Sequence, residues 1–549
     1  ENGSLILPSR IRGTPRMNRR RLLSTTVAGT VVMTIGACGR ADPNNPKTSR
    51  STNRRLELLL DEPATIDPAL VAQSHEATVV DALFEPLVRI TEGGQTHPAS
   101  AVSWQITDNG RAYQFNLNAG NQWTSGEAVS ADDFVWSWIR NLNPELGSTF
   151  NYLLFPISGA EEFANGIGDR NSIRIHAPDT TTLRVHLHEP SLDLLARTAT
   201  STFLPLPRSE IEGMGTHWTD PSNIRTNGAY TLAQWDRGLG MTLHRNSTYQ
   251  GQAATFRDVV IRYPSTTTSR STEFRTGTSH AAEISRSDYA EARTSELLRP
   301  RLRLFERAGG WFLVINTRKE PWSSPLVRRA LSIALDRPAL VAAVFDQPTL
   351  PADRLIPSSI LANAPQSVLD IPHAQALLTE AGFDGGQGLP TLRLTYHRTD
   401  QWDRLAVELA RQWGEALNLR VEPDVREWRD FLSFSDNPGD FDAYRAGWTS
   451  EYRHPENWYN DLWHSNVDFF RSGWSSSVFD THLAAARTAP TDEATRAAYR
   501  AADNILESEV PAIPIARHAS AFLLKSNVTA FAVDPISGAI DLSKVELGD

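Results

Sequence analysis

The sequence predicts a mixed α/β fold divided into several lobes, on the evidence of its length, its composition and its hydrophobic patterns. The chain has 549 residues, of which 40% are hydrophobic and 21% are charged. This is an ordinary globular composition, but the chain is too long for one core, so at least two or three lobes are expected. Strand-like stretches at 392–396 and 419–423 flank an amphipathic helix around 402–417. They predict a βαβ-like unit in a late lobe.

Local patterns predict the other elements in chain order. Residues 56–60 form an apolar, strand-like run before a Pro-rich turn and a helix at about 76–84. Strands at 104–106 and 112–117 surround an Asp-Asn-Gly turn. Ser130 is expected to cap a helix that begins at Ala131, because acids in the first turn favour the positive end of a helix. A buried strand at 311–315 precedes a helix with apolar residues at helical spacing.

Residues 17–37 are expected to be an export signal, and residues 1–16 lie upstream of its plausible start at Met17 without forming a recognisable domain. A basic stretch at 17–21 precedes an apolar run at 22–35, and Ile-Gly-Ala-Cys at 35–38 resembles a bacterial lipobox. The resemblance implies a lipid on Cys38 and attachment to the cell membrane, facing its extracytoplasmic side. The alternative is a short buried helix with an incidental thiol. Arginines at 19–21 loosely resemble a twin-arginine signal, and 38–54 reads as a flexible polar tether.

Charge and cysteine content exclude several classes of protein. Residues 1–37 carry six Arg and one Glu, which leaves a net charge of −15 on the rest of the chain. An acidic body argues against a nucleic-acid partner. A single Cys rules out an internal disulfide framework, and no Cys remains for thiol catalysis. The chain has no G-x-S-x-G elbow, and His75-Glu76 lacks the second His of a zinc-binding helix.

Long stretches of the sequence resemble one family. Residues 56–70 (LELLLDEPATIDPAL), 79–90 (VVDALFEPLVRI), 98–144 and 309–345 resemble the oligopeptide- and dipeptide-binding proteins of bacterial peptide importers. The stretch 217–230 (HWTDPSNIRTNGAY) is most similar to the oligopeptide branch. The resemblance extends over about 56–545. It implies an extracytoplasmic, monomeric binding protein without enzymatic activity or cofactor, which delivers short peptides to the permease subunits of an ABC importer.

The resemblance also implies a three-lobed, class II periplasmic-binding-protein-like fold with a hinge and an interlobe cleft. The first lobe would comprise 55–84, 212–308 and 519–549, the second 85–211 and the third 309–518. The chain would cross between bodies near Gly309 and His518. Such crossings act as a hinge when a ligand closes two lobes on each other.

Opposite charges flank a Gly-Trp pair in 441–458 (FDAYRAGWTSEYRHPENW). The stretch begins as a strand in which Gly447 lets another backbone approach and Trp448 offers a broad face. Arg445 and Glu451 would hold an extended molecule that has a carboxylate at one end and an ammonium at the other, which describes a peptide. The alternative is a core strand with a packed Trp and a surface ion pair.

Peptide-contacting positions of the family fall on identifiable residues of this chain. The acid that receives the peptide ammonium falls at Glu451, where family members more often carry Asp, and the Arg that meets the carboxylate falls at Arg445. A family His used for longer ligands is replaced by Trp402, which leaves the peptide length open. The other predicted contacts are the Trp428 and Trp448 walls, Tyr152, the Gly447 backbone, and the backbone of Ala72, Gln73 and Ser74.

Two further functions stay open from the sequence. A lipid-anchored protein of this size can be a secreted hydrolase, although the expected catalytic motifs are missing. The same cleft can also take a non-peptide cargo, such as haem or a nickel complex. No metal-ligating residue is predicted, because the 14 His are scattered along the chain.

Overall fold

The computed structural model describes residues 54–91, 93–252, 254–265, 267–362, 368–489 and 491–548. The predicted signal, Cys38 and nearly all of the tether therefore lie outside the described residues. Within these ranges, no helix has the length and apolar character that crossing a bilayer requires.

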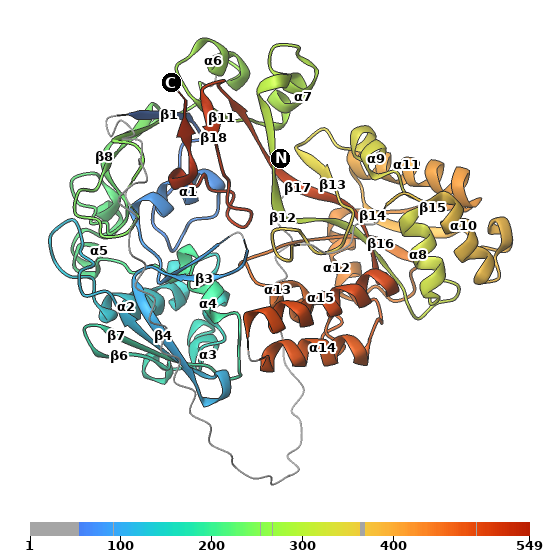
Figure 1. Cartoon of the computed structure of the whole chain (residues 1–549), viewed down its shortest axis with the longest axis horizontal. Helices are drawn as coiled ribbons and strands as arrows, with labels where there is room; N and C mark the ends of the chain where they lie inside the picture. Colours follow the sequence, from blue (N-terminus) through green and yellow to red (C-terminus); the bar gives the residue numbers. More distant parts are fainter. Residues whose placement is uncertain are drawn as a thin grey trace, which may run out of the picture. The chain divides into compact units, whose positions relative to one another are not determined.

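One long mixed sheet extends through the described chain in the order β15-β14-β16-β12-β17-β11-β1-β10-β9-β8, with β13 paired to β17 (Figure 1). Its strands are β1 (Arg55–Leu59), β8 (Tyr230–Asp236), β9 (Gly240–Arg245), β10 (Asp258–Arg262), β11 (Ala281–Glu283), β12 (Leu302–Ile315), β13 (Thr349–Pro351), β14 (Leu392–His397), β15 (Val421–Arg426), β16 (Ala443–Thr449) and β17 (Ala512–Leu524).

The strands β12 and β17 are the longest of this sheet and pair with each other in antiparallel fashion. The register is interrupted between Glu306 and Gly310. A Cβ on Gly310 would lie 2.2 Å from the carbonyl oxygen of Ala516, so only glycine allows this approach. The predicted crossing points Gly309 and His518 lie on these two strands, beside the interruption. The hinge itself stays a prediction.

A second, antiparallel sheet has the order β4-β5-β7-β6. Its strands are β4 (Ala101–Thr107), β5 (Ala112–Leu117), β6 (Ile175–Asp179) and β7 (Thr182–His186). The helix α2 (Ala131–Leu142) contacts β6 and β7. Ser130 and Asp133 form a reciprocal capping box at its start, which confirms the predicted cap. A smaller pair consists of β2 (Val88–Ile90) and β3 (Thr96–Pro98), and another of β18 (Val528–Ala530) and β19 (Glu546–Leu547).

The helices α8 (Pro325–Ile333), α9 (Arg337–Val344), α10 (Ile371–Glu380) and α11 (Asp400–Leu417) share one apolar core. A separate core joins α12 (Trp428–Asp436), α13 (Glu456–Trp458), α14 (Ser477–Thr488) and α15 (Asp492–Glu509). The predicted βαβ unit is confirmed, because β14 and β15 are parallel neighbours connected by α11.

The largest core is formed almost entirely by residues of 56–281 and 522–545. Its one buried member from the intervening chain is Tyr452, which follows β16. The remaining helices are α1 (Ser74–Leu83), α3 (Ala160–Ala164), α4 (Leu194–Arg197), α5 (Arg208–Met214), α6 (Arg270–Thr276) and α7 (Arg286–Thr294).

Candidate functional site

The strand β16 has one fully paired edge and one largely open edge. On one side it pairs with β12 along its whole length, from Ala443 to Thr449. On the other side β14 pairs only with Ala443 and Tyr444. From Arg445 to Thr449 this second edge therefore has no strand partner within the described ranges. Unpaired backbone donors and acceptors of this kind can accept an added strand.

Arg445 is a buried cation whose partners are neutral. Its side chain belongs to a residue that is 6% exposed, and its guanidinium lies 4.9 Å from the ring centroid of Trp402 and 5.0 Å from that of Phe431. One terminal nitrogen donates to Nδ1 of His397 at 2.9 Å, whereas Nε has no hydrogen-bond partner among the described residues. Burial lowers the pKa of Arg445 to about 10. The alternative of a surface ion pair is therefore wrong for this Arg.

His397 completes the aromatic surroundings of Arg445. Its ring lies 4.7 Å from Trp428 and 6.2 Å from Trp402, measured between centroids. Burial and the nearby Arg445 charge lower the pKa of His397 to about 4. The imidazole is therefore neutral at physiological pH and accepts the hydrogen bond from Arg445. Trp428 is 42% exposed, whereas Trp402 is 5% exposed and packs against Trp311; their role as pocket walls stays a prediction.

Glu451 lies beyond the end of β16 and contacts a residue from a distant part of the chain. The hydroxyl of Tyr152 donates to Oε1 of Glu451 at 2.5 Å. Burial is the main cause that raises the pKa of Glu451, and the hydrogen bond from Tyr152 opposes it. The structure thus brings together two residues that the sequence predicted for one site. This donor to the carboxylate is a phenol rather than a cation.

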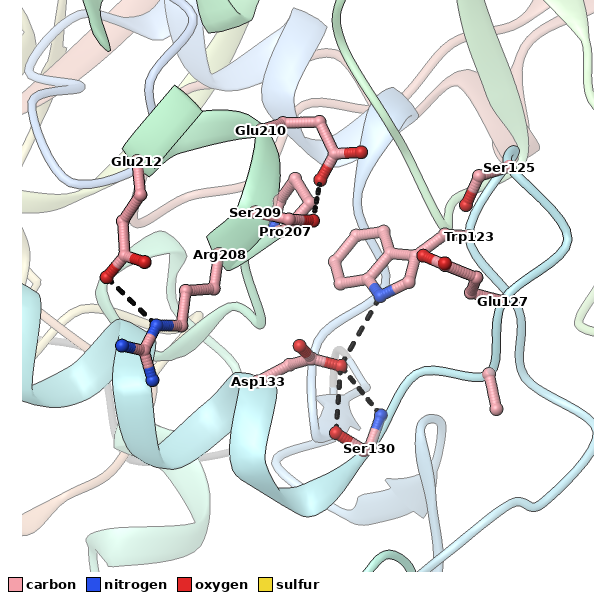
Figure 2. Close-up of a pocket in the computed structure, with 11 residues that line it drawn as sticks. Trp123, Ser125, Glu127, Ser130, Asp133, Pro207, Arg208, Ser209, Glu210 and Glu212 are labelled. Atoms are coloured by element: carbon pink, nitrogen blue, oxygen red, sulfur yellow. Dashed lines mark hydrogen bonds and ion pairs between the residues drawn. The ribbon is translucent and has the colours of Figure 1, made fainter. Parts of the chain in front are cut away.

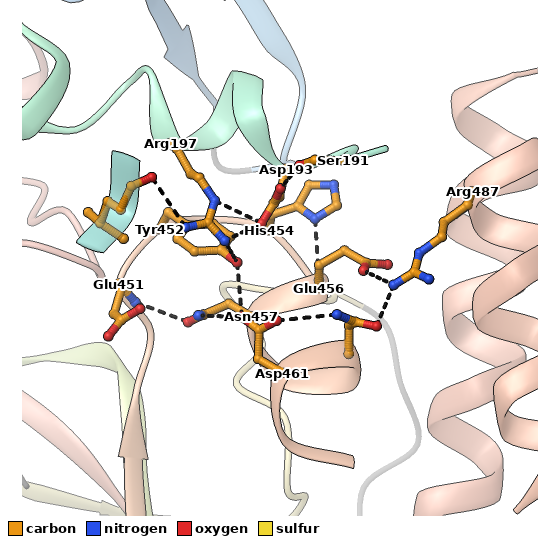
Figure 3. Close-up of polar contacts among 12 residues, drawn as sticks. Ser191, Asp193, Arg197, Glu451, Tyr452, His454, Glu456, Asn457, Asp461 and Arg487 are labelled. Atoms are coloured by element: carbon orange, nitrogen blue, oxygen red, sulfur yellow. Dashed lines mark hydrogen bonds and ion pairs between the residues drawn. The ribbon is translucent and has the colours of Figure 1, made fainter. Parts of the chain in front are cut away.

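Asn457 connects two of the predicted residues. Its Oδ1 accepts hydrogen bonds from the backbone amide of Glu451 at 3.1 Å and from the indole of Trp448 at 3.4 Å. Its amide group donates to Asp461 at 3.2 Å (Figure 3). The side chain of Asn457 is fully buried. Sequence reasoning missed both Asn457 and His397, because no spacing in the sequence shows which polar side chains meet in the fold.

The segment 72–74 leads into α1, with Gln73 as the N-cap and Ser74 as the first helical residue. The backbone amides of Ala72 and Gln73 donate to the carboxylate of Glu76 at 2.9 and 3.0 Å, and the hydroxyl of Ser74 donates to Glu283 at 3.0 Å. These donors are therefore bonded within the chain. The Gln73-x-x-Glu76 spacing is a capping box that could have been found in the sequence.

A surface pocket elsewhere in the fold does not include the predicted residues. It is lined by the loop around Trp123, the start of α2 and the α5 residues Arg208 and Glu212 (Figure 2). The indole of Trp123 donates to Asp133, and Arg208 pairs with Glu212, so these polar groups bond to one another. Among the described residues, no group of three or more His, Cys, Asp or Glu is arranged to hold a metal ion.

Comparison with known proteins gives one consistent family. Residues 95–470 match the family described as "Bacterial extracellular solute-binding proteins, family 5 Middle". The probable deoxycholate-binding periplasmic protein of Escherichia coli K12 is 30% identical over 482 residues, which are 86% of this chain and 89% of that protein. The periplasmic murein peptide-binding protein of the same organism is 28% identical, over 92% of this chain and 95% of its own.

The fold has the same relatives. The unliganded open form of a periplasmic murein tripeptide-binding protein matches with a TM-score of 0.80 and 25% identity, covering 90% of this chain and 97% of that one. The predicted α/β fold of the periplasmic-binding-protein type is confirmed by this match. The family match spans more than half of the sequence and includes β16 with both Arg445 and Glu451. The chain therefore belongs to family 5 of the bacterial extracellular solute-binding proteins.

Proposed function

We propose that this protein captures short peptides outside the cytoplasm and delivers them to the permease subunits of an ABC importer. The observation that supports this is the placement of two unlike charges around an open strand edge. Arg445 is a buried cation with no carboxylate partner in the described chain, and Glu451 is an acid bonded to a phenol. A peptide carries a carboxylate and an ammonium at its two ends, which match these two groups.

Main-chain recognition would make the binding tolerant of peptide sequence. The open edge of β16 from Arg445 to Thr449 presents amides and carbonyls to which an extended peptide can add as a strand. Strand residues advance roughly 3.3 Å each, so the charged side chains at the two ends suit a ligand of only a few residues. Of the segment 72–74, the carbonyl oxygen of Ala72 would contribute, because the amides of Ala72 and Gln73 are bonded to Glu76 and the carbonyls of Gln73 and Ser74 accept bonds from Ala77 and Thr78.

The names of the relatives include several cargoes: murein peptides, oligopeptides, deoxycholate and haem. Deoxycholate and haem carry carboxylates but no ammonium group. Either one would pair with Arg445 and bring no cation to the buried acid Glu451. A ligand with both charges satisfies both residues, and this favours a peptide.

Membrane attachment is part of the proposal. A lipid on Cys38 would hold the protein at the extracytoplasmic face of the membrane, near its importer. A Cys38→Ser protein is expected to leave the membrane fraction and to keep its peptide affinity. Retention of that variant in washed membranes would show that another anchor exists.

Titration of the purified protein with one labelled peptide in four forms tests the function. The forms are unmodified, N-acetylated, C-amidated and doubly blocked. Saturable binding that weakens with each blocked end, with the peptide recovered intact by mass spectrometry, supports the proposal. Cleaved peptide would identify a hydrolase. Tight binding of deoxycholate, haem or a nickel complex, without binding of any peptide form, would overturn the peptide assignment.

A further inference from the structure

The residue after Glu451 is buried in a different core from the strand that precedes it. Tyr444 and Ala446 of β16 belong to the core that includes α12–α15. Tyr452 is 0% exposed and belongs to the core built from 56–281 and 522–545. The chain therefore leaves one core and enters another at Glu451. The position of this carboxylate depends on what holds Tyr452.

Arg197 holds Tyr452 by two contacts. Its guanidinium lies over the Tyr452 ring at 4.2 Å from the centroid, and a terminal nitrogen donates to the Tyr452 hydroxyl at 2.8 Å. Arg197 is itself fixed by Asp193 through bonds of 2.9 and 2.7 Å, and both side chains are about nine-tenths buried. The Tyr452 hydroxyl donates onward to Asp461 at 3.1 Å (Figure 3). The ring and the hydroxyl are thus held separately.

Arg453 adds a second attachment to the same part of the protein. It donates to the carbonyl oxygen of Thr91 at 3.0 Å and to Asp534 at 3.1 Å, and its side chain is 8% exposed. On the other side of Glu451, the amide of Ser450 donates to the carbonyl of Ala308 at 2.8 Å. Glu451 is therefore restrained by both of its neighbours in sequence, entirely through contacts within the chain.

We propose that Tyr452, Arg453 and Arg197, here called the Glu451 anchor, are positioning residues that hold the Glu451 carboxylate against Tyr152. None of the three is assigned a contact with the peptide. The inference rests on the proposed function, because it treats Glu451 as the acceptor of a ligand ammonium. The acceptor is then attached to the core formed by 56–281 and 522–545, against which Tyr152 also packs. The ligand's ammonium then meets an acid that is already oriented, which spares the ordering cost that a mobile acid would add.

Two conservative changes test the anchor. Tyr452→Phe keeps the buried ring under the Arg197 guanidinium, and removes both the bond from Arg197 to the hydroxyl and the bond from the hydroxyl to Asp461. Arg453→Met keeps the apolar stem and removes the bonds to Thr91 and Asp534. Together they are expected to weaken binding of the free-amine peptide 3- to 10-fold and of the N-acetylated peptide less than 2-fold. Arg453→Lys, which restores a cation beside Asp534, should recover part of the loss.

A second readout follows the Glu451 carboxylate directly. Carbon-13 NMR of the protein without peptide should show that its pKa, raised by burial in the wild type, moves toward the ordinary Glu value when both changes are present. Matched controls are Tyr249→Phe, which removes a hydroxyl bonded to Glu85, and Arg496→Met, which removes an exposed ion pair with Glu493. The controls should change neither readout.

The Glu451→Gln background separates the two possible failures. There the anchor changes should have no further effect on the preference for a free amine. If Glu451→Gln by itself does not alter that preference, the proposed role of the acid is wrong, and the NMR readout still tests the anchor. If Glu451→Gln abolishes the preference while the anchor variants affect both peptides equally and leave the carboxylate pKa unchanged, the anchor inference is wrong.

Discussion

Replacing Arg445 with Met should weaken binding without lowering the stability of the protein. Arg445 is buried, its partners are His397 and two aromatic rings, and burial lowers its pKa from 12.5 to about 10. At about 1.4 kcal/mol per pKa unit, burial of the cation costs about 3 kcal/mol. A buried charge without a counterion destabilises the fold, so its removal relieves this cost.

The magnitude follows from the contacts that the substitution removes. The hydrogen bond to His397 contributes about 1 kcal/mol, and the contacts over Trp402 and Phe431 contribute about 1 kcal/mol each. Their loss, about 3 kcal/mol in total, is offset by relief of the buried charge. The expected change in stability is therefore near zero. The affinity for a peptide with a free carboxylate should fall about 10- to 150-fold, because a charge-assisted hydrogen bond contributes about 1.5–3 kcal/mol.

Calorimetric titration and thermal unfolding measure the two effects on the same samples. C-amidation of the peptide should cost the wild type about as much affinity as the Arg445→Met change does, and should cost the variant almost nothing. Arg426→Met is the matched control, since Arg426 also lies over an aromatic ring, at 4.1 Å from Phe434, but has a carboxylate partner in Asp424. A large drop in the unfolding midpoint of Arg445→Met, with unchanged discrimination between carboxylate and amide, would refute the reasoning.

Three further predictions concern Glu451, Glu507 and Gly447. Glu451→Gln should reduce affinity for free-amine peptides about 10- to 150-fold and for N-acetylated ones less than 2-fold. Because burial raises the pKa of Glu451, wild-type affinity for free-amine peptides should also fall as the pH drops through that raised value. A flat pH profile would contradict this. Burial raises the pKa of Glu507 from 4.5 to about 7, so between these pH values the folded state retains a proton that the unfolded state releases. The free energy of unfolding should therefore decrease by at most about 3 kcal/mol as the pH rises from 4.5 to 7. Glu507→Gln should remove that slope in denaturant unfolding, and an unchanged slope would exclude Glu507 as its source. Gly447→Ala would place a Cβ 3.0 Å from the carbonyl oxygen of Gly310 and from Cδ1 of Trp311. This overpacking should cost roughly 1–3 kcal/mol of stability and lower the unfolding midpoint by a few degrees. An unchanged midpoint would show that the strand can shift.

Local patterns predicted the elements well where one residue type has one strong preference. The cap at Ser130 and the β14-α11-β15 unit are examples, because a capping side chain and a change from strand to helix periodicity are both readable over a few residues. The alternative of a surface ion pair at Arg445 failed because the burial of a side chain is not a local property. Spacing along a strand says which face a side chain occupies, but not how deeply the neighbouring helices bury that face.

The amino-acid sequence by itself determined the α/β class, the family resemblance and the two charges around Gly447-Trp448. Only the tertiary structure decided what those charges meet: His397 for Arg445, and Tyr152, 299 positions away, for Glu451. It also placed Tyr452 in a core otherwise formed by other parts of the chain. The physical reason is that helix and strand preferences act over neighbouring residues, whereas partners across the fold depend on strand order and on the packing of distant segments.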